Sequence, residues 1–579
     1  MRRVFLLGVL LLLAVAASNR AMAADAFGAW SNGIPTGWVE GPTCNPYVDY
    51  NCTPSKAIMA LKSSAYGPCD PYVNYKCLDD YLGDNVALRF LRYYQLEWGK
   101  GVAPSDPSAP PGRRSDAAWP PTPQSTPPMP FTEWPYGGTE NIGVTRPNSV
   151  DSPLMVAIAN TALGRAMSDA HVQVYGWVEG GGNLSTNSIK PGGNVPAAYD
   201  YTPNTIQLDQ AVIYIERLAD TVQNDHIDWG FRLSALYGVD YRYTTAYGLF
   251  SYQLLNHNFV NGYDFPMVYS DIYFPVFQGM DVRIGRFISV PDIEAQLAPN
   301  NFTYVHSLTY TFDNYTNTGV EVTTALTKNW ILQLGVTVGS DTMPWNIGAT
   351  VTNLLPGNPL YPGATIPKDP GAVPSGTVGL RWTSDDGKDD LNLVADAING
   401  GQWGYNNLQW LGGTYYHKLN DYWHLAVEVW NMHENNVPNL NNPTAAAIVA
   451  GGGTPFGPNV MPFNSVNAAF CPNAAVLTCR ADEQSFLLYL NYSPNKLNNF
   501  SLRTEWFDDH NGQRTGVATR YVDIAASWQH WFSPQIEARP EIAFYKSLDA
   551  PAFNGDVNAG IPPTRNYAVI GAADVIIHF

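Results

Sequence analysis

Charged side chains in this chain recur at every second position of short, mostly apolar segments. In the stretch 535–545, Glu537, Arg539 and Glu541 alternate with apolar residues. Because successive side chains of a β-strand point to opposite faces, such a stretch gathers its charges on one face of a sheet. Carboxylates and guanidinium groups gathered on an inner face can bind and select ions and polar solutes. The chemistry that this spacing favours is therefore selection of charged solutes.

The face opposite each apolar stripe predicts a polar inner surface with an excess of carboxylates, which would favour cations or cationic solutes. A register shift of one residue would reverse every assignment in a strand. An alternative stays open, in which inward ion pairs only hold the wall together. The inner face comprises ten acidic residues and four arginines: Glu179, Arg232, Asp240, Asp281, Arg283, Asp396, Glu428, Arg503, Glu505, Asp523, Glu537, Arg539, Glu541 and Asp574.

The stretch 283–301 is the best candidate for a narrow point. Arg286 ends a strand-like segment, and Pro291, Asp292 and Glu294 begin a loop whose sequence resembles a short helix. We expect this loop either to constrict the space inside the sheet or to brace its wall. The pore-lining residues that we predict are Arg232, Asp281, Arg283, Arg286, Asp292, Glu294, Arg503, Glu505, Glu537, Arg539 and Glu541.

Other groupings of reactive residues give weaker evidence of a functional site. The run Ser384–Asp390 contains four carboxylates but lacks the spacing and terminal Glu of an EF-hand loop, so we expect a hairpin turn there. His306-Ser307 and Asp509-His510 suggest a hydrolase, yet the chain has no G-x-S-x-G motif. We therefore predict no enzymatic activity, no metal site and no cofactor.

The elements that would position these charges are alternating segments of about ten residues, separated by clusters of Gly, Asn, Asp and Pro. Because bacterial single-chain barrels use even strand numbers, we predict an all-β fold: a transmembrane antiparallel up-and-down β-barrel of about 16 strands, within 14–18. Long insertions are expected at about 241–266, 341–376 and 433–483. The candidate segments are 171–181, 205–217, 226–240, 267–278, 280–289, 306–314, 319–328, 330–339, 377–384, 390–398, 409–418, 422–432, 485–493, 500–508, 520–531, 535–545 and 566–579.

The first and last residues both point to export. Residues 1–23 combine a basic start, an apolar core and the A-x-A motif Ala21-Met22-Ala23, as a signal peptide does. The apolar core is shorter than the roughly 20 residues of a membrane-spanning helix. The stretch 566–579 alternates apolar residues up to the terminal Phe579, which resembles the signal that the bacterial barrel-insertion machinery recognises.

Six cysteines form three pairs, each with seven intervening residues. Two pairs lie in the repeat CNPYVDYNC and CDPYVNYKC. Disulfides are the predicted outcome, because a four-cysteine metal site would need more closely spaced cysteines. The sequence does not fix which cysteines pair across the repeat. The predicted organisation is a signal peptide over 1–23, a small Cys-repeat module over 24–100 with a short helix over 84–98, a Pro-rich linker over 101–140 and a barrel over 141–579. The paired residues are Cys44 and Cys52, Cys69 and Cys77, and Cys471 and Cys479.

The composition agrees with this organisation. Only 14% of the residues are charged, whereas 34 Tyr and 17 Trp suit a protein with an apolar outer belt and aromatic girdles. The net charge of −18 argues against a nucleic-acid partner.

Longer motifs add a family resemblance. The segment DYRYTTAYG at 240–248, QLLNH at 253–257, GRFISVPDIEAQLAPNN at 285–301 and YTFD at 310–313 together resemble the OmpL-like family of outer-membrane β-barrel porins, from about 171 to 579. This resemblance implies a channel in the bacterial outer membrane for passive diffusion of small hydrophilic solutes or ions. Expected partners are outer-membrane lipid, the barrel-insertion machinery and further copies of the chain. The alternatives are a non-conducting structural or adhesive barrel and a barrel hydrolase.

Overall fold

The computed structural model describes most of the chain beyond residue 151 and one short stretch before it. Among the described residues, no helix has the length and apolar character needed to cross a membrane. The described residues are 75–98, 152–348 and 370–579, apart from 218, 220–224, 256, 289–291, 328, 386–387, 405–406, 421, 451–467, 496, 534 and 557–560.

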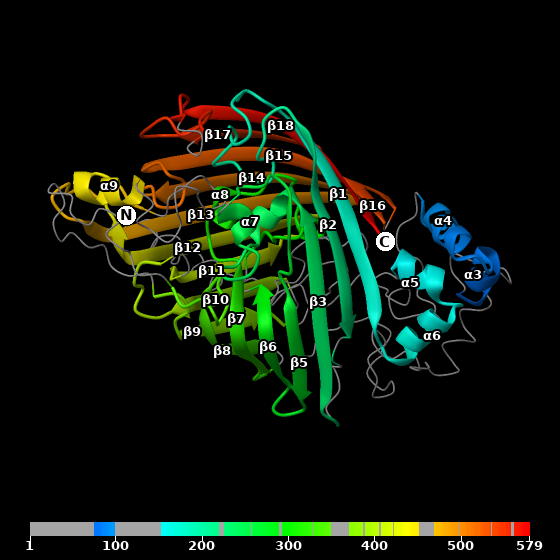
Figure 1. Ribbon diagram of the computed structural model, residues 1–579. Coiled ribbons are helices and arrows are strands. Elements are labelled where there is room, and N and C mark those ends of the chain that lie inside the picture. The colour runs from blue at the N-terminus through cyan, green and yellow to red at the C-terminus, as the bar shows by residue number, and fades with distance from the viewer. Residues whose placement is uncertain are drawn as a thin grey trace, which may run out of the picture.

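The strands form one closed antiparallel sheet (Figure 1). The first strand pairs with both the second and the last, so the sheet has no free edge and its backbone groups find partners within it. The strands are β1 Gln173–Ser185, β2 Ile206–Arg217, β3 Asp228–Gly238, β4 Gly262–Asp264, β5 Val268–Phe274, β6 Met280–Ile288, β7 Thr316–Ala325, β8 Trp330–Ser340, β9 Ser375–Thr383, β10 Asp389–Ile398, β11 Gln409–Lys418, β12 Trp423–Pro438, β13 Thr478–Asn495, β14 Asn498–Asp509, β15 Thr519–Ser533, β16 Ile536–Ala538, β17 Glu541–Ser547 and β18 Tyr567–His578.

Two of the barrel strands are each interrupted once. β16 and β17 both bridge β15 and β18, and they are separated at Arg539 and Pro540. β4 and β5 both pair with β3 and are separated by residues that include Pro266. Proline has no backbone N–H to donate, which explains a break in the ladder at these points. Counting each interrupted pair as one strand gives a barrel of 16 strands, which confirms the predicted number.

Sixteen of the seventeen predicted segments coincide with these strands, and one prediction is wrong. The segment 306–314 is not a strand: it contains the short helix α8, Leu308–Thr311, and lies between β6 and β7. Its side chains are buried at every position, so its mixture of polar and apolar residues does not reflect two different faces. The predicted insertion 433–483 is also shorter, because β12 extends to Pro438 and β13 begins at Thr478.

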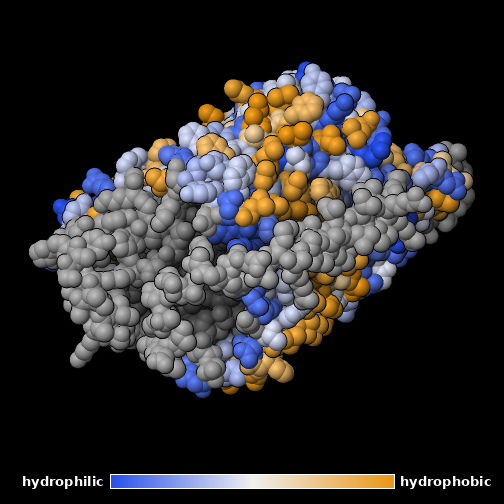
Figure 2. Space-filling model, turned by 180° about the vertical axis from the view of Figure 1, so that it is seen from behind, coloured by the Kyte–Doolittle hydropathy of each residue, from blue (hydrophilic) through white to orange (hydrophobic). Residues whose placement is uncertain are grey.

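The outer face of the wall is apolar. On β8, Trp330, Leu334 and Val336 are exposed, whereas the alternating Gln333 and Thr337 are buried. β18 repeats the pattern along its length. Figure 2 shows apolar side chains gathered in patches over the outside of the molecule. This alternation is the pattern of a barrel wall whose outer face meets lipid.

The two ends of the barrel differ. At one end the strands are joined by short connections. One of them joins Thr383, the last residue of β9, to Asp389, the first residue of β10, within the run predicted as a hairpin turn. The start of β1 and the end of β18 lie at this end (Figure 1). The long connections join strand ends that lie at the other end, and one of them contains the helix α9, Pro443–Ala450. They are 186–205, 239–261, 289–315, 341–374, 439–477 and 548–566.

Four short helices pack beside the end with the short turns (Figure 1). They are α3 Tyr75–Leu82, α4 Val86–Glu97, α5 Pro153–Ile158 and α6 Ala162–Asp169, and α4 is the helix predicted over 84–98. Leu82 of α3, Tyr93 and Leu96 of α4 and Val156 of α5 form one buried core. The Trp98 ring stacks on Phe532 of β15 with 5.6 Å between ring centroids, which joins the helices to the barrel.

Candidate functional site: a segment packed inside the barrel

Residues 292–315, here called the inserted segment, connect β6 to β7 and pack against the inner face of the wall. Every described side chain in the inserted segment is buried, apart from the half-buried Ala295. Its Tyr304, Leu308 and Phe312 share one apolar cluster with Trp410 and Trp430 from the strands. The segment contains the short 3-10 helix η5, Ala298–Asn300, and α8. The stretch that the sequence singles out as a narrow point therefore forms part of a larger element that runs to Tyr315.

Carboxylates from the wall accept hydrogen bonds from the backbone of the inserted segment. Glu541 Oε2 accepts from the N–H groups of Tyr304 at 3.0 Å and Val305 at 3.1 Å. Glu505 accepts from the N–H groups of Leu308, at 2.9 Å, and Thr309. A buried irregular segment must find partners for its peptide groups, and bonds to a charged acceptor are about twice as strong as neutral ones.

Two arginines from the wall donate to carbonyl groups of the same segment. Arg539 Nη1 donates to the carbonyl oxygens of Ala298 at 2.7 Å and Asn301 at 3.1 Å. Arg503 Nη1 donates to the carbonyl oxygen of Val305. The donors and acceptors carry opposite charges and come from β14 and from the strand that β16 and β17 form, and together they bind several backbone groups between Ala298 and Thr309.

The same arginines are neutralised by carboxylates of the wall. Arg539 pairs with Asp574 of β18 and, at 3.0 Å, with Glu179 of β1. Arg503 pairs with Asp523 of β15 at 2.9 Å and lies 3.5 Å from Glu294 of the inserted segment. Because all of these groups are buried, removing one partner would leave an uncompensated charge in a region of low dielectric.

His306 and Ser307, the pair in the inserted segment that suggested a hydrolase, have structural partners. Ser307 Oγ donates to Glu294 at 2.6 Å, and it accepts the N–H of Tyr310 as the N-cap of α8. Burial lowers the pKa of His306 to about 3, and its ring stacks on Tyr199 at 3.6 Å between centroids. Burial raises the pKa of Glu294, which also accepts from Ser307 N–H and the Tyr489 hydroxyl. The contacts of Ser307 are those of a helix cap.

A second group of charged residues pairs within the wall. Arg232 of β3 lies 2.6 Å from Glu216 of β2, and Arg283 of β6 lies 2.9 Å from Asp271 of β5. Arg381 of β9 lies 2.6 Å from Asp390 of β10. These pairs join adjacent strands.

The structure therefore divides the predicted pore-lining residues. Glu294, Arg503, Glu505, Arg539 and Glu541 meet at the inserted segment, together with Asp292, which begins it. Arg232 and Arg283 belong to pairs within the wall, and so does Arg286, which lies 3.0 Å from Asp264. Arg286 also donates to the carbonyl oxygen of Thr244, in the connection between β3 and β4. Asp281 is buried on β6, and Glu537 accepts from Gln529 at 2.7 Å. Pore lining itself stays a prediction for all of them.

Sequence reasoning missed two contributors. Gln210 of β2 donates to the carbonyl oxygen of Gln296 at 2.8 Å and accepts the N–H of Ala298 at 3.1 Å. Asp313 falls within the segment 306–314, which is predicted as a strand, whereas in the structure it lies near the end of the inserted segment. A neutral Gln on an inner face gives no electrostatic signal, and only the long gap between β6 and β7 could have drawn attention to Asp313.

Phe579 closes the barrel at its seam. Its backbone N–H donates to the carbonyl oxygen of Gly176 at 2.8 Å, and its carbonyl oxygen accepts the N–H of Gly176 at 3.1 Å. Ser152, the N-cap of α5, also donates to this carbonyl oxygen at 3.2 Å. The pairing of β1 with β18 thus continues to the last residue. Its role as an assembly signal stays a prediction.

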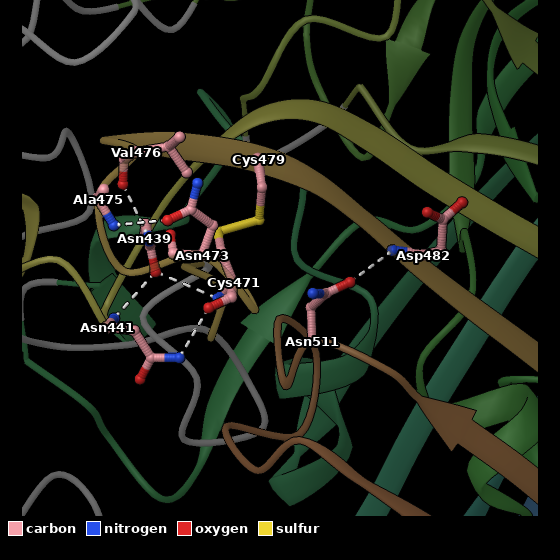
Figure 3. The surroundings of a disulfide bond; sticks show 9 residues. All are labelled: Asn439, Asn441, Cys471, Asn473, Ala475, Val476, Cys479, Asp482 and Asn511. Carbon is pink, nitrogen blue, oxygen red and sulfur yellow. Dashed lines mark hydrogen bonds between the residues drawn. A yellow bond between two sulfur atoms is a disulfide. The ribbon is translucent and has the colours of Figure 1, made fainter.

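The predicted disulfide between Cys471 and Cys479 is confirmed, and it lies at the end with the long connections (Figure 3). Asn439, just after β12, organises its surroundings: the Asn439 side chain donates to the carbonyl oxygens of Asn473 and Val476 and accepts the N–H of Cys471. These bonds hold the connection between β12 and β13 close to the strand ends. The predicted bridges of Cys44, Cys52, Cys69 and Cys77 lie outside the described residues.

A family model described as Putative beta-barrel porin-2, OmpL-like, matches residues 171–579. The chain belongs to this family of β-barrel porins. The match begins just before β1 and ends at Phe579, so it covers the whole barrel and the inserted segment, as the sequence resemblance predicts. No curated protein matches the chain.

Solved porin structures resemble the OmpL-like chain at low identity. An anion-selective porin from Comamonas acidovorans is 10% identical with a TM-score of 0.39, covering 70% of this chain and 99% of that one. The outer-membrane channel DcaP of Acinetobacter baumannii is 10% identical with a TM-score of 0.40, covering 70% and 97%. A loop-deletion mutant of OmpT, an outer-membrane protein of Vibrio cholerae, is 9% identical with a TM-score of 0.39, covering 70% and 99%.

Proposed function

We propose that this protein is an outer-membrane channel for passive diffusion of small hydrophilic solutes, in which the inserted segment sets the width of the lumen. The observation that carries the proposal is the packing of residues 292–315 against the inner face of a closed barrel whose outer face is apolar. Membership of a porin family supports the channel. The many hydrogen bonds to the wall support a segment that stays in one place while solute passes.

A preference for cations follows from the charges. All ten carboxylates and four arginines predicted for the inner face are buried. An excess of carboxylates around a lumen raises the local concentration of cations. The reversal potential of the purified protein in a salt gradient across a planar bilayer measures this preference. We expect the sign of a cation-selective pore, and an anion-selective reversal potential would contradict the proposal.

Single-channel recording tests the width of the lumen directly. Deleting residues 292–299 removes the first part of the inserted segment, including Asp292, Glu294 and the Ala298 carbonyl group that Arg539 holds. We expect a larger conductance than in the wild type. A matched control replaces Cys471 and Cys479 by Ser, because this pair lies at the end with the long connections and should leave conductance unchanged.

Two outcomes would contradict the proposal. An equal conductance in the wild type and the deletion variant would mean that the segment only braces the wall. Absence of any conductance from correctly folded protein would favour a non-conducting structural or adhesive barrel.

The outer membrane is the proposed location, with the short turns and helices α3–α6 on the periplasmic side and the long connections outside. Lipid would cover the apolar outer face, and the barrel-insertion machinery would recognise the final strand. We expect a chain that lacks Phe579 to reach the outer-membrane fraction in a much smaller amount. Normal insertion of that chain would contradict the assembly signal.

Association with further copies of the chain belongs to the same proposal, and the mass of the detergent-solubilised protein measures it.

A further inference from the structure

We propose that Asp292, Asp313 and Glu428 bind a hard divalent cation, Ca²⁺ in particular, which ties both ends of the inserted segment to the barrel wall. Asp292 is the first described residue of the segment, Asp313 lies near its end, and Glu428 is on β12. One carboxylate oxygen from each of the three residues lies within 4.8 Å of the others. Residues that are far apart in the sequence therefore converge on one point.

The spacing of these oxygens suits one ion. Ca²⁺ binds oxygen ligands at about 2.3–2.6 Å, so two ligands of the same ion are at most about 5 Å apart. A separation of up to 4.8 Å therefore allows a single Ca²⁺ to contact all three carboxylates. Carboxylates are hard oxygen donors, and three of them carry enough negative charge to compensate a divalent ion.

A second observation points to a ligand. Both carboxylate oxygens of Asp313 are buried and accept no hydrogen bond, and the same holds for Asp292 Oδ1 and Glu428 Oε1. Asp313 and Glu428 are completely buried, and only 6% of Asp292 is exposed. Leaving a buried charged group without a partner costs several kcal/mol. A cation at the point where the carboxylates meet would satisfy these oxygens together.

The surrounding groups hold the three carboxylates in place, and the nearby charge of Arg514 stabilises the ionised form of Asp313. Glu428 Oε2 accepts the N–H of Ile293 at 2.9 Å, which fixes one side of that carboxylate and leaves Oε1 free to bind an ion. Arg514 approaches the same turn, but it donates to the backbone carbonyl oxygens of Phe312, at 2.9 Å, and Asp313, at 3.3 Å. These two hydrogen bonds hold the backbone of the turn.

Protons shared between the carboxylates are the alternative way to relieve the electrostatic repulsion among Asp292, Asp313 and Glu428. Burial raises the pKa of Asp292 and of Asp313 well above the ordinary value for a carboxyl group, and the neighbouring carboxylates raise it further. A site that holds only protons would not respond to Ca²⁺. The two occupants can therefore be told apart by a binding measurement.

The experiment measures Ca²⁺ bound to the purified full-length protein in detergent, after stripping with EDTA, by equilibrium dialysis with radioactive Ca²⁺. The wild type is compared with Glu428→Gln and with a control, Asp396→Asn. Asp396 is also a buried carboxylate of the wall, and it accepts from Asn314 of the inserted segment at 3.2 Å, but it is not one of the three converging residues. We expect the wild type and the control to bind one more Ca²⁺ per chain than Glu428→Gln, whose affinity at this site should fall by about tenfold or more.

Equal binding by the wild type and Glu428→Gln would overturn the proposal. Asp313→Asn replaces Glu428→Gln where the latter does not fold, as judged by its heat-modifiable mobility in gels. Ca²⁺ should also raise the unfolding temperature of the wild type more than an equal concentration of Mg²⁺ does. An unfolding temperature that Ca²⁺ leaves unchanged would overturn the proposal without recourse to any variant.

The consequence for permeation rests on the proposed channel function. Removing Ca²⁺ would free both ends of the inserted segment, so the wild type should show larger or noisier conductance in EDTA than in Ca²⁺. Binding is measured without any current, so a protein that binds Ca²⁺ but does not conduct would refute the channel and leave the cation site standing. A protein that conducts but binds no Ca²⁺ would refute the cation site and leave the channel standing.

Discussion

Two parts of the inner wall use the same residue types for different purposes. On β2–β10, Arg232, Arg283 and Arg381 each pair with a carboxylate of the adjacent strand. On β14–β17, Arg503 and Arg539 pair with carboxylates and also donate to the backbone of the inserted segment. The first part is here called the self-paired wall and the second the anchoring wall.

The difference follows from what each wall faces. An irregular backbone inside a barrel brings peptide groups that no sheet satisfies. The charges of the anchoring wall bind several of these groups, and Gln210 of β2 and Glu428 of β12 bind others. Ion pairs between neighbouring strands need nothing beyond the register of the sheet. The inner charges of a barrel thus split into those that hold the wall together and those that position an element within it, and the two classes should respond differently to mutation.

The largest effect is expected from Arg539→Gln. It leaves Asp574 and Glu179 without their buried cation, and it weakens the hold on Ala298 and Asn301. Breaking a buried pair from one side costs about 3–5 kcal/mol. We expect a lower free energy of unfolding, measured by urea titration in detergent, together with increased or fluctuating single-channel conductance.

Arg381→Gln on the self-paired wall is the matched control. It also breaks a buried pair, with Asp390 on the adjacent strand, and should lower the free energy of unfolding by a comparable amount. Its conductance should stay close to that of the wild type, because the lost contact lies within the wall. If both variants changed conductance equally, the division into two walls would fail.

A smaller effect is expected from Ser307→Ala. This change removes the N-cap of α8 and one hydrogen bond to Glu294, which should cost about 1 kcal/mol. We expect a slight destabilisation and a measurable change in channel noise. Ser152→Ala removes the N-cap of α5, outside the barrel, and should cost a similar amount with no change in noise.

The sequence predicts the wall better than the anchoring contacts, for a physical reason. Alternation along β8 or β18 is a local property, and burial on one face is enough to reveal which residues point inward. All fourteen residues predicted for the inner face are buried, although Asp240 lies in the 3-10 helix after β3 and Arg539 lies between β16 and β17. The contact between Arg539 and Ala298 joins residues 241 positions apart, and no local pattern encodes it.

The error at 306–314 has the same origin. Alternation identifies a strand only where one side meets a different environment, and the inserted segment is buried on all sides. Convergence of Asp292, Asp313 and Glu428 was likewise invisible, because two of these residues belong to an element whose path crosses the barrel interior. The sequence therefore predicts the strands that surround the site, whereas the partner of each charged residue is determined by long-range contacts in the fold.

The most direct test of the account is a cross-link between the inserted segment and β13, the strand that precedes the anchoring wall. Thr309 Oγ1 lies 2.6 Å from Ser485 Oγ of β13, so the double variant Thr309→Cys, Ser485→Cys should form a disulfide in the folded protein. We expect mass spectrometry of the oxidised, membrane-inserted barrel to detect this link. Thr309→Cys paired with Ser234→Cys, on the self-paired wall, should give none. Absence of the first link, or equal yields of both, would contradict the placement of residues 292–315 against β13–β17.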